Sequence, residues 1–131
     1  MQNTNKKNRT YDLADRLISF NLMIGNLCDL IVKTKEGLNI KTQLSRSVSS
    51  AALNYGEALV PESTPDFIHK IGICLKELME SKMSLSLVVG RNLCEDQILA
   101  KNCIGECSEL IAIFIASKTT AKNNLRNAKS K

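Results

Sequence analysis

The residues that could hold a metal ion through a histidine and a carboxylate are few in this chain. His69 is the only histidine, and Asp66 precedes it by three residues, so the two would share one turn of a helix. Carboxylate-bridged metal bundles need about four carboxylates and two histidines that project into the core. Asp66 also suits the first turn of a helix, where the helix dipole favours a negative charge. We therefore expect neither a metal site nor a cofactor.

The five cysteines are the other candidate metal ligands or nucleophiles. Cys103 and Cys107 are four residues apart and could hold zinc together with Cys94 or His69. Both belong to an apolar stripe, however, and no CxxC pair occurs in the full set, which is Cys28, Cys74, Cys94, Cys103 and Cys107. We expect reduced cysteines packed in a core. No Ser-His-Asp grouping, nucleophile elbow or phosphate-binding glycine loop is recognisable, so the sequence predicts a protein without a catalytic site.

The net charge of +5 comes from the two ends of the chain. Residues 1–10 and 118–131 together carry eight basic residues and no acidic one, whereas residues 11–117 carry ten basic and thirteen acidic residues. Basic ends of this kind either bind phosphates electrostatically or are simply solvated. If nucleic acid binds, the candidate residues are Lys41, Arg46, Lys118, Lys122 and Arg126.

The elements that would position these residues are four helices. Apolar residues alternate in steps of four and three, which predicts amphipathic helices at about 11–33, 39–59, 65–89 and 94–122. Gly37 is expected to end the first helix in a left-handed conformation, and Gly90 to close the third. Thr64 suits the N-cap of the third helix, with Pro65 at its first position.

The whole chain, residues 1–131, is expected to form one domain. Four amphipathic helices with short connections predict an all-α, antiparallel, up-down-up-down four-helix bundle, with basic and mobile ends at 1–10 and 123–131. No apolar run approaches the ~20 residues of a membrane helix, and no signal peptide is recognisable, so a cytoplasmic protein without a membrane partner is expected.

A line of polar residues follows the second predicted helix. Its members are spaced by three or four residues and share one stripe, with two acidic residues expected opposite them on the third helix: Gln43, Arg46, Ser50, Asn54 and Glu57, facing Glu77 and Glu80. Antiparallel pairing would bring Arg46 towards Glu77 and Glu80, and Ser50 and Asn54 towards Cys74 and Lys70. The line is either a solvated face or a partly buried, hydrogen-bonded seam that sets the register of the two helices.

Some apolar residues exceed what a lone bundle would bury. Residues 110–116 read LIAIFIA, which leaves Ile113 away from the core stripe, and Leu22 and Val89 raise the same question on other helices. A shared apolar patch on two helices favours a subunit contact, so the chain is expected to self-associate.

The polar line also carries a family resemblance. Residues 43–58 read QLSRSVSSAALNYGEA and resemble the Q-L-x-R-(small)-x-x-S-x-x-x-N-(apolar)-(small)-E-G signature of the 23S rRNA intervening-sequence protein family, apart from Ala58 at the final glycine. The resemblance continues in STPDF at 63–67 and LKELME at 75–80, and it covers about residues 11 to 115.

The resemblance implies a four-helix bundle that assembles into a ring-shaped homopentamer. The family includes relatives of the accessory variability determinant protein of diversity-generating retroelements, which works with a reverse transcriptase and its template RNA. We therefore expect a non-catalytic, oligomeric binding or assembly protein. The alternative is a nucleic-acid-associated accessory protein that acts with RNA or a reverse transcriptase.

Overall fold

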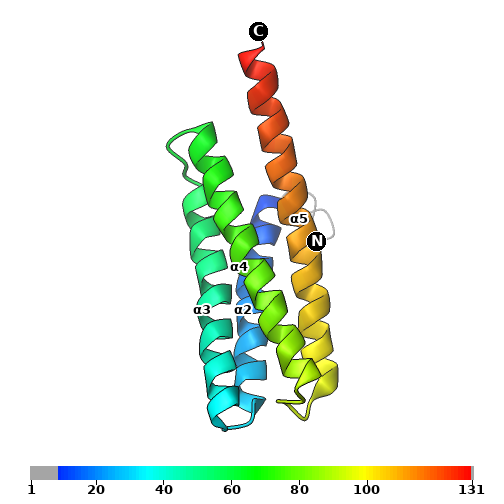
Figure 1. The fold of residues 1–131 in the computed structure, drawn as a ribbon. Helices are drawn as coiled ribbons and strands as arrows, with labels where there is room; N and C mark the ends of the chain where they lie inside the picture. Colours follow the sequence, from blue (N-terminus) through cyan, green and yellow to red (C-terminus); the bar gives the residue numbers. More distant parts are fainter. Residues whose placement is uncertain (1–8, 131) are drawn as a thin grey trace, which may run out of the picture.

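Four long helices make up almost all of the structure, a computed structural model that describes the backbone of residues 9–130 and the side chains of residues 13–130. They are α2 (Arg9–Leu30), α3 (Lys35–Ala58), α4 (Thr64–Gly90) and α5 (Gln97–Lys129) (Figure 1). Within residues 9–130 none of the helices is long and apolar enough to cross a bilayer.

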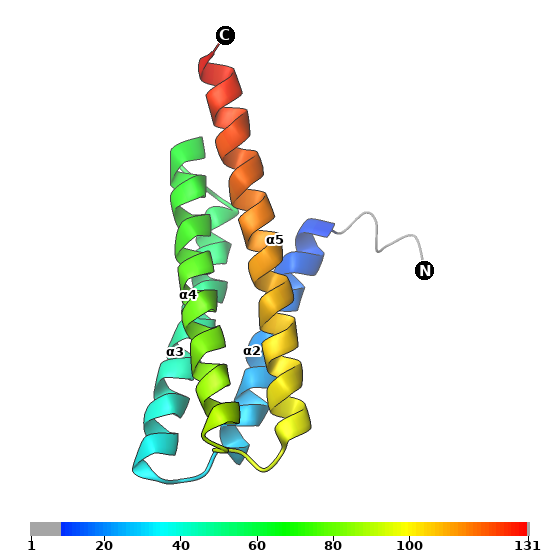
Figure 2. The same ribbon diagram turned by 45° about the vertical axis from the view of Figure 1, so that its right-hand side comes forward.

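The helices run alternately up and down. Each packs against the next along the chain, and α2 closes the ring against α5, whereas the described residues of the diagonal pairs make no close backbone approach. Figure 2 shows that α5 continues well past the loop between α3 and α4. This packing confirms the all-α four-helix bundle that the periodicity predicts.

The core contains the apolar stripes expected from the four-three spacing. Phe20, Leu44, Leu78 and Phe114 are all fully buried, one from each helix. Tyr55 on α3 meets Phe114 on α5 edge to face, with 5.5 Å between the ring centroids. Leu59, which ends the expected stripe of the second helix, is exposed, because α3 stops at Ala58.

The first helix ends at Leu30 and the second begins after Thr34, so Gly37 lies inside the second helix. The Thr34 hydroxyl accepts a hydrogen bond from the Gly37 amide at 3.1 Å, which caps α3 and starts it four residues earlier than expected. The left-handed Gly37 terminator is therefore wrong, and no glycine among the described residues has a positive φ. Gly37 is buried because the Val32 carbonyl lies where a side chain would be, so this position needs a glycine for space.

The other helix ends also differ from the sequence prediction. The hydroxyl that caps α4 belongs to Ser63 instead of Thr64, and it accepts from the Asp66 amide at 3.1 Å. Beyond Gly90, the left-handed residue is Asn92, with φ 53°. Asp96 caps α5, so this helix starts three residues after Cys94, which is buried in the preceding loop.

The C-terminal end is helical as far as Lys129, which corrects the expectation of a tail from residue 123. No proline or glycine follows Gly105, and Ala, Lys, Leu and Arg favour helix here. The expected mobile segment 1–10 falls almost wholly outside the described residues, as do Lys6, Lys7 and Lys131.

One buried polar contact joins the middle of α3 to α4. The Ser47 and Ser81 hydroxyls lie 2.7 Å apart, and both side chains are fully buried. Each hydroxyl also lies within hydrogen-bonding distance of a carbonyl of its own helix, Leu44 for Ser47 and Glu77 for Ser81, so one hydroxyl donates to its carbonyl and the other donates to its partner serine. Small side chains at both positions let the two helices approach closely while every buried hydroxyl remains satisfied.

We expect Gly37→Ala to lower the free energy of unfolding by about 1–3 kcal/mol, because the new methyl group would overlap the Val32 carbonyl. The matched control is Gly25→Ala in the middle of α2, where no atom lies within 4 Å of the added carbon. The control should gain up to about 1 kcal/mol from helix propensity. Urea unfolding of both variants measures the difference, and equal stabilities would contradict the close approach of Val32.

Ser81→Ala should lower the free energy of unfolding by about 1 kcal/mol relative to Ser86→Ala. Both serines are on α4 and bond to a carbonyl four residues back, so the two variants gain the same helix propensity. Only Ser81 is buried and bonded to Ser47. Thermal melting of the pair isolates this contact, and two superimposable transitions would show that it contributes nothing.

Candidate functional site

Arg46 joins α3 to α4 through two carboxylates. Its guanidinium forms ion pairs with Glu80 and, at 3.5 Å, with Glu77. The hydrogen bond with Glu80 raises the pKa of Arg46 and lowers the pKa of Glu80. The Arg46 side chain is half exposed, so solvent screens these pairs and they add little to stability.

The other members of the polar line do not form a continuous seam between the helices. Glu57 pairs with Lys70 of α4 at 2.5 Å, whereas Asn54 donates to the carbonyl and the hydroxyl of Ser50 within its own helix. The hydrogen bonds of Asn54 stay within α3, so the expected approach of Ser50 and Asn54 to Cys74 and Lys70 remains a prediction. Cys74 donates to the Ala51 carbonyl at 3.4 Å.

The line consequently lies at the rim of the α3–α4 contact. Gln43, Arg46 and Glu57 are exposed, and Ser50 and Asn54 are half-buried. The buried polar contact is made by Ser47, the residue after Arg46, and the Ser47 side chain is buried in the bundle. The sequence held a signal for it, because Ser47 and Ser81 both fall in the apolar stripes of their helices.

The five basic residues named from the sequence fall in different places. Lys41 is half-buried on α3 near Cys28, and Arg46 is engaged by the two carboxylates of α4. Lys118 and Lys122 lie together on the side of α5 that faces α4. Arg126 is exposed one turn further along α5. The structure therefore brings only Lys118 and Lys122 to a common site.

The site is a groove of about 520 Å³ between α4 and α5, which we call the lysine groove. Its lining combines basic residues of both helices with small and apolar ones: Pro65, Ile68, His69, Gly72, Ile73, Lys76, Lys118 and Lys122. Lys76 and His69 were not recognised from the sequence as parts of a basic site. Their spacing on α4 is unremarkable, and only the register with α5 sets them opposite Lys118 and Lys122.

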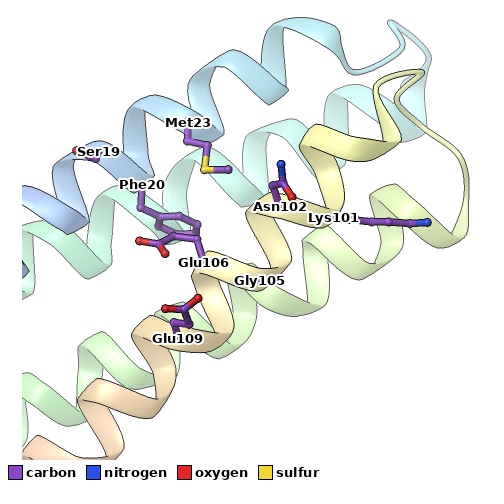
Figure 3. Close-up of a pocket in the computed structure, with 8 residues that line it drawn as sticks. All are labelled: Ser19, Phe20, Met23, Lys101, Asn102, Gly105, Glu106 and Glu109. Atoms are coloured by element: carbon purple, nitrogen blue, oxygen red, sulfur yellow. The ribbon is translucent and has the colours of Figure 1, made fainter.

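A second groove, of about 400 Å³, lies between α2 and α5. Figure 3 shows Phe20 and Met23 of α2 facing Glu106 and Glu109, which come from successive turns of α5. Arg16 donates two hydrogen bonds to Glu106, at 2.7 and 2.8 Å, and a third to Glu109 at 2.8 Å. Both carboxylates of this groove are therefore already engaged by Arg16, which the sequence reasoning did not anticipate.

The cysteines are free and buried. Burial raises the pKa of Cys74 and Cys107 to about 12, and that of Cys103 to about 11. Nucleophilic and metal-binding cysteines need the thiolate. Within the part of the chain that the structure describes, no three His, Cys, Asp or Glu residues gather as a metal site.

Of the three apolar residues expected at a subunit contact, only Leu22 is exposed. Val89 and Ile113 are half-buried, and Val89 packs against the core. Exposed apolar side chains form rows on two helices. One row on α4 contains Met79, Met83 and Leu87, and a shorter one on α2 contains Ile18 and Leu22.

Comparison with known proteins finds a similar fold among solved structures. No protein-family model matches the chain, and no curated protein matches it. The chain is similar to the crystal structure of a protein with unknown function from the S23 ribosomal protein family of Bacteroides thetaiotaomicron. The TM-score is 0.73 at 25% sequence identity, and the match covers 81% of this chain and 97% of that one. This likeness in fold and sequence confirms that the chain resembles the S23 ribosomal protein family, that of the 23S rRNA intervening-sequence proteins.

Proposed function

We propose that this protein is a non-catalytic, self-associating helical-bundle protein of the cytoplasm, which assembles into a ring and binds a partner. The row on α4 carries this proposal. Met79, Met83 and Leu87 follow one another at four-residue intervals and are 48%, 67% and 48% exposed. Large apolar side chains aligned on one helix face typically mark an interaction surface rather than a solvated one.

The second apolar row suggests how copies would meet. Ile18 and Leu22 are also four residues apart and exposed, and they lie on α2, which is diagonal to α4 in the bundle. Two different patches on opposite sides of a molecule favour a head-to-tail contact, in which α2 of one copy packs against α4 of the next. Such contacts form a ring when the rotation between successive copies closes, which agrees with the homopentamer that the family resemblance implies.

Two further observations support the non-catalytic and cytoplasmic parts of the proposal. The buried thiols of Cys74, Cys103 and Cys107 have raised pKa values, so they are poor nucleophiles at neutral pH. All five cysteines are unpaired, which suits a reducing compartment.

We expect Leu22→Glu and Met83→Glu each to dissociate the assembly to a 14.5 kDa monomer, because a charge in an apolar contact must lose its water. A mixture of the two variants should form a one-to-one dimer and no ring. Each variant keeps one intact row, so one productive contact remains. Light scattering coupled to gel filtration measures all three masses.

Leu53→Glu is the matched control, because Leu53 is 69% exposed and the residues one turn away on either side of it are small or polar. It should leave the mass unchanged. A wild-type monomer at high concentration would sink the proposal, and a mixture that stays monomeric would sink the head-to-tail contact.

A second candidate function is that of a nucleic-acid-associated accessory protein, acting with RNA or with a reverse transcriptase. The observation that favours it is the charge of α5. No acidic residue follows Glu109, whereas Lys118, Lys122 and Arg126 recur at every turn of the helix. Regularly spaced basic residues on an acid-free stretch of helix suit a polyanion.

Single-stranded RNA should bind the full chain more weakly as salt increases. A protein that neutralises several phosphates loses at least about tenfold in affinity between roughly 50 and 200 mM salt, because bound counterions are released. Fluorescence anisotropy with a labelled oligonucleotide measures the slope. The absence of binding at low salt rules this function out.

A further inference from the structure

We propose that the lysine groove between α4 and α5 binds phosphate groups of a nucleic-acid backbone through Lys76, Lys118 and Lys122. This inference rests on the second candidate function and assigns it a site. The groove volume of about 520 Å³ is ample for a phosphate with its sugar. Lysine ammonium groups bind phosphate as point charges and need no fixed donor geometry.

The charges that would compete for these lysines are turned away from the groove. On α4, Glu77 and Glu80 face α3 and pair with Arg46, and Asp66 lines a separate hollow on the α3 side with Glu57 and Lys70. On α5, the nearest preceding acidic residue is Glu109, which pairs with Arg16 of α2. Each of these acidic side chains is therefore occupied on another face of the bundle.

The lysines themselves are unpaired. Among residues 13–130, the ion pairs involve Arg16, Arg46, Lys70 and Arg91, and none involves Lys76, Lys118 or Lys122. Lys76 lies near enough to Glu80 to help lower the pKa of that carboxyl, but Glu80 forms its ion pair with Arg46. Among residues 13–130, none of the three lysines around this hollow has a carboxylate within ion-pair distance. This arrangement repels itself until an anion enters, so it favours a bound phosphate.

The absence of a side chain at Gly72 lets Lys118 of α5 lie against α4. A side-chain carbon added at Gly72 would lie 3.2 Å from the Lys118 ammonium nitrogen, which shows that Lys118 rests directly on the backbone of α4. Because of this contact, the charge of α5 reaches over α4 towards Lys76. His69 adds an imidazole N–H on the same wall of the groove.

A polyanion fits better than a single small phosphate. Beyond the groove, Arg126 and Lys129 extend the basic surface along the projecting end of α5, where α5 itself carries no acidic residue. Consecutive members of the row Lys118, Lys122 and Arg126 are about 6 Å apart along the helix axis. A nucleic-acid backbone could therefore enter the groove and continue along α5.

The decisive experiment compares three variants of the full chain for binding to a labelled single-stranded RNA. The groove variant is Lys76→Gln, Lys118→Gln and Lys122→Gln. The matched control is Lys33→Gln, Lys35→Gln and Lys101→Gln, which removes the same charge from exposed positions at the other end of the bundle. The third variant, Gly72→Leu, keeps every charge but fills the groove.

We expect the groove variant to bind at least about tenfold more weakly and its salt slope to fall by about 2, since each lost phosphate contact lowers the slope for a single strand by about 0.7. Gly72→Leu should also weaken binding, and the control should bind as the wild type does. Equal losses in the groove variant and the control would overturn the inference. So would unaltered binding by Gly72→Leu, because the charges would then act without the groove. The two lysine variants should melt as the wild type does, since the replaced lysines form no ion pair.

If the wild type binds no RNA, the second candidate function fails and the groove is tested with inorganic phosphate. Phosphate should then raise the melting temperature of the wild type, but not of the groove variant, relative to chloride at equal ionic strength. That result would keep the phosphate site and assign it to a free phosphate compound. The same melting temperatures in both salts would overturn the site.

Discussion

Helix α4 has to pack against α3 on one side and against α5 on the other, and most of the molecule is arranged by this double contact. Its buried stripe, which includes Ile71, Cys74, Leu78 and Leu85, satisfies both neighbours at once. Loss of that stripe would leave α3 and α5 connected only through α2, because the described residues of α3 and α5 make no close backbone approach. The remaining sides of α4 are then free to carry different chemistry.

Those sides are strongly segregated. Glu77 and Glu80 lie towards α3 and engage Arg46, whereas Gly72 and Lys76 lie towards the C-terminal part of α5. Exposed apolar residues such as Met83 occupy the outward side. One helix therefore presents an ion-pair rim, a basic groove and an apolar row, and a helix can do this because residues a few positions apart point in different directions.

The two ends of the bundle are built differently. At one end, the loop before α3 and the loop before α5 are tied together, since the Val32 amide donates to the Leu93 carbonyl at 2.8 Å and Gly37 leaves space for the Val32 carbonyl. At the other end, α5 projects past the α3–α4 loop without a neighbouring helix (Figure 1). The proposed phosphate contacts lie at this open end, where backbone and side chains remain accessible to a large ligand.

The amino-acid sequence by itself determined the fold. Four apolar stripes in steps of four and three require four helices, and short connections make them antiparallel. Most of the buried residues belong to these stripes, and the loop before α5 adds Leu93 and Cys94. The sequence also predicted that Arg46 would meet Glu77 and Glu80 at the α3–α4 rim, because antiparallel pairing of the two helices places these residues opposite one another.

Only the tertiary structure decided how residues far apart in the chain combine. Helical periodicity places Lys118 on a face of α5 but does not say that Gly72 lies beneath it or that Lys76 stands across from it. Likewise, Gly37 reads as a helix terminator until the Val32 carbonyl is seen in its place. Such sites depend on the axial offset and rotation of packed helices, which side-chain volumes set through many small contacts that no local pattern encodes.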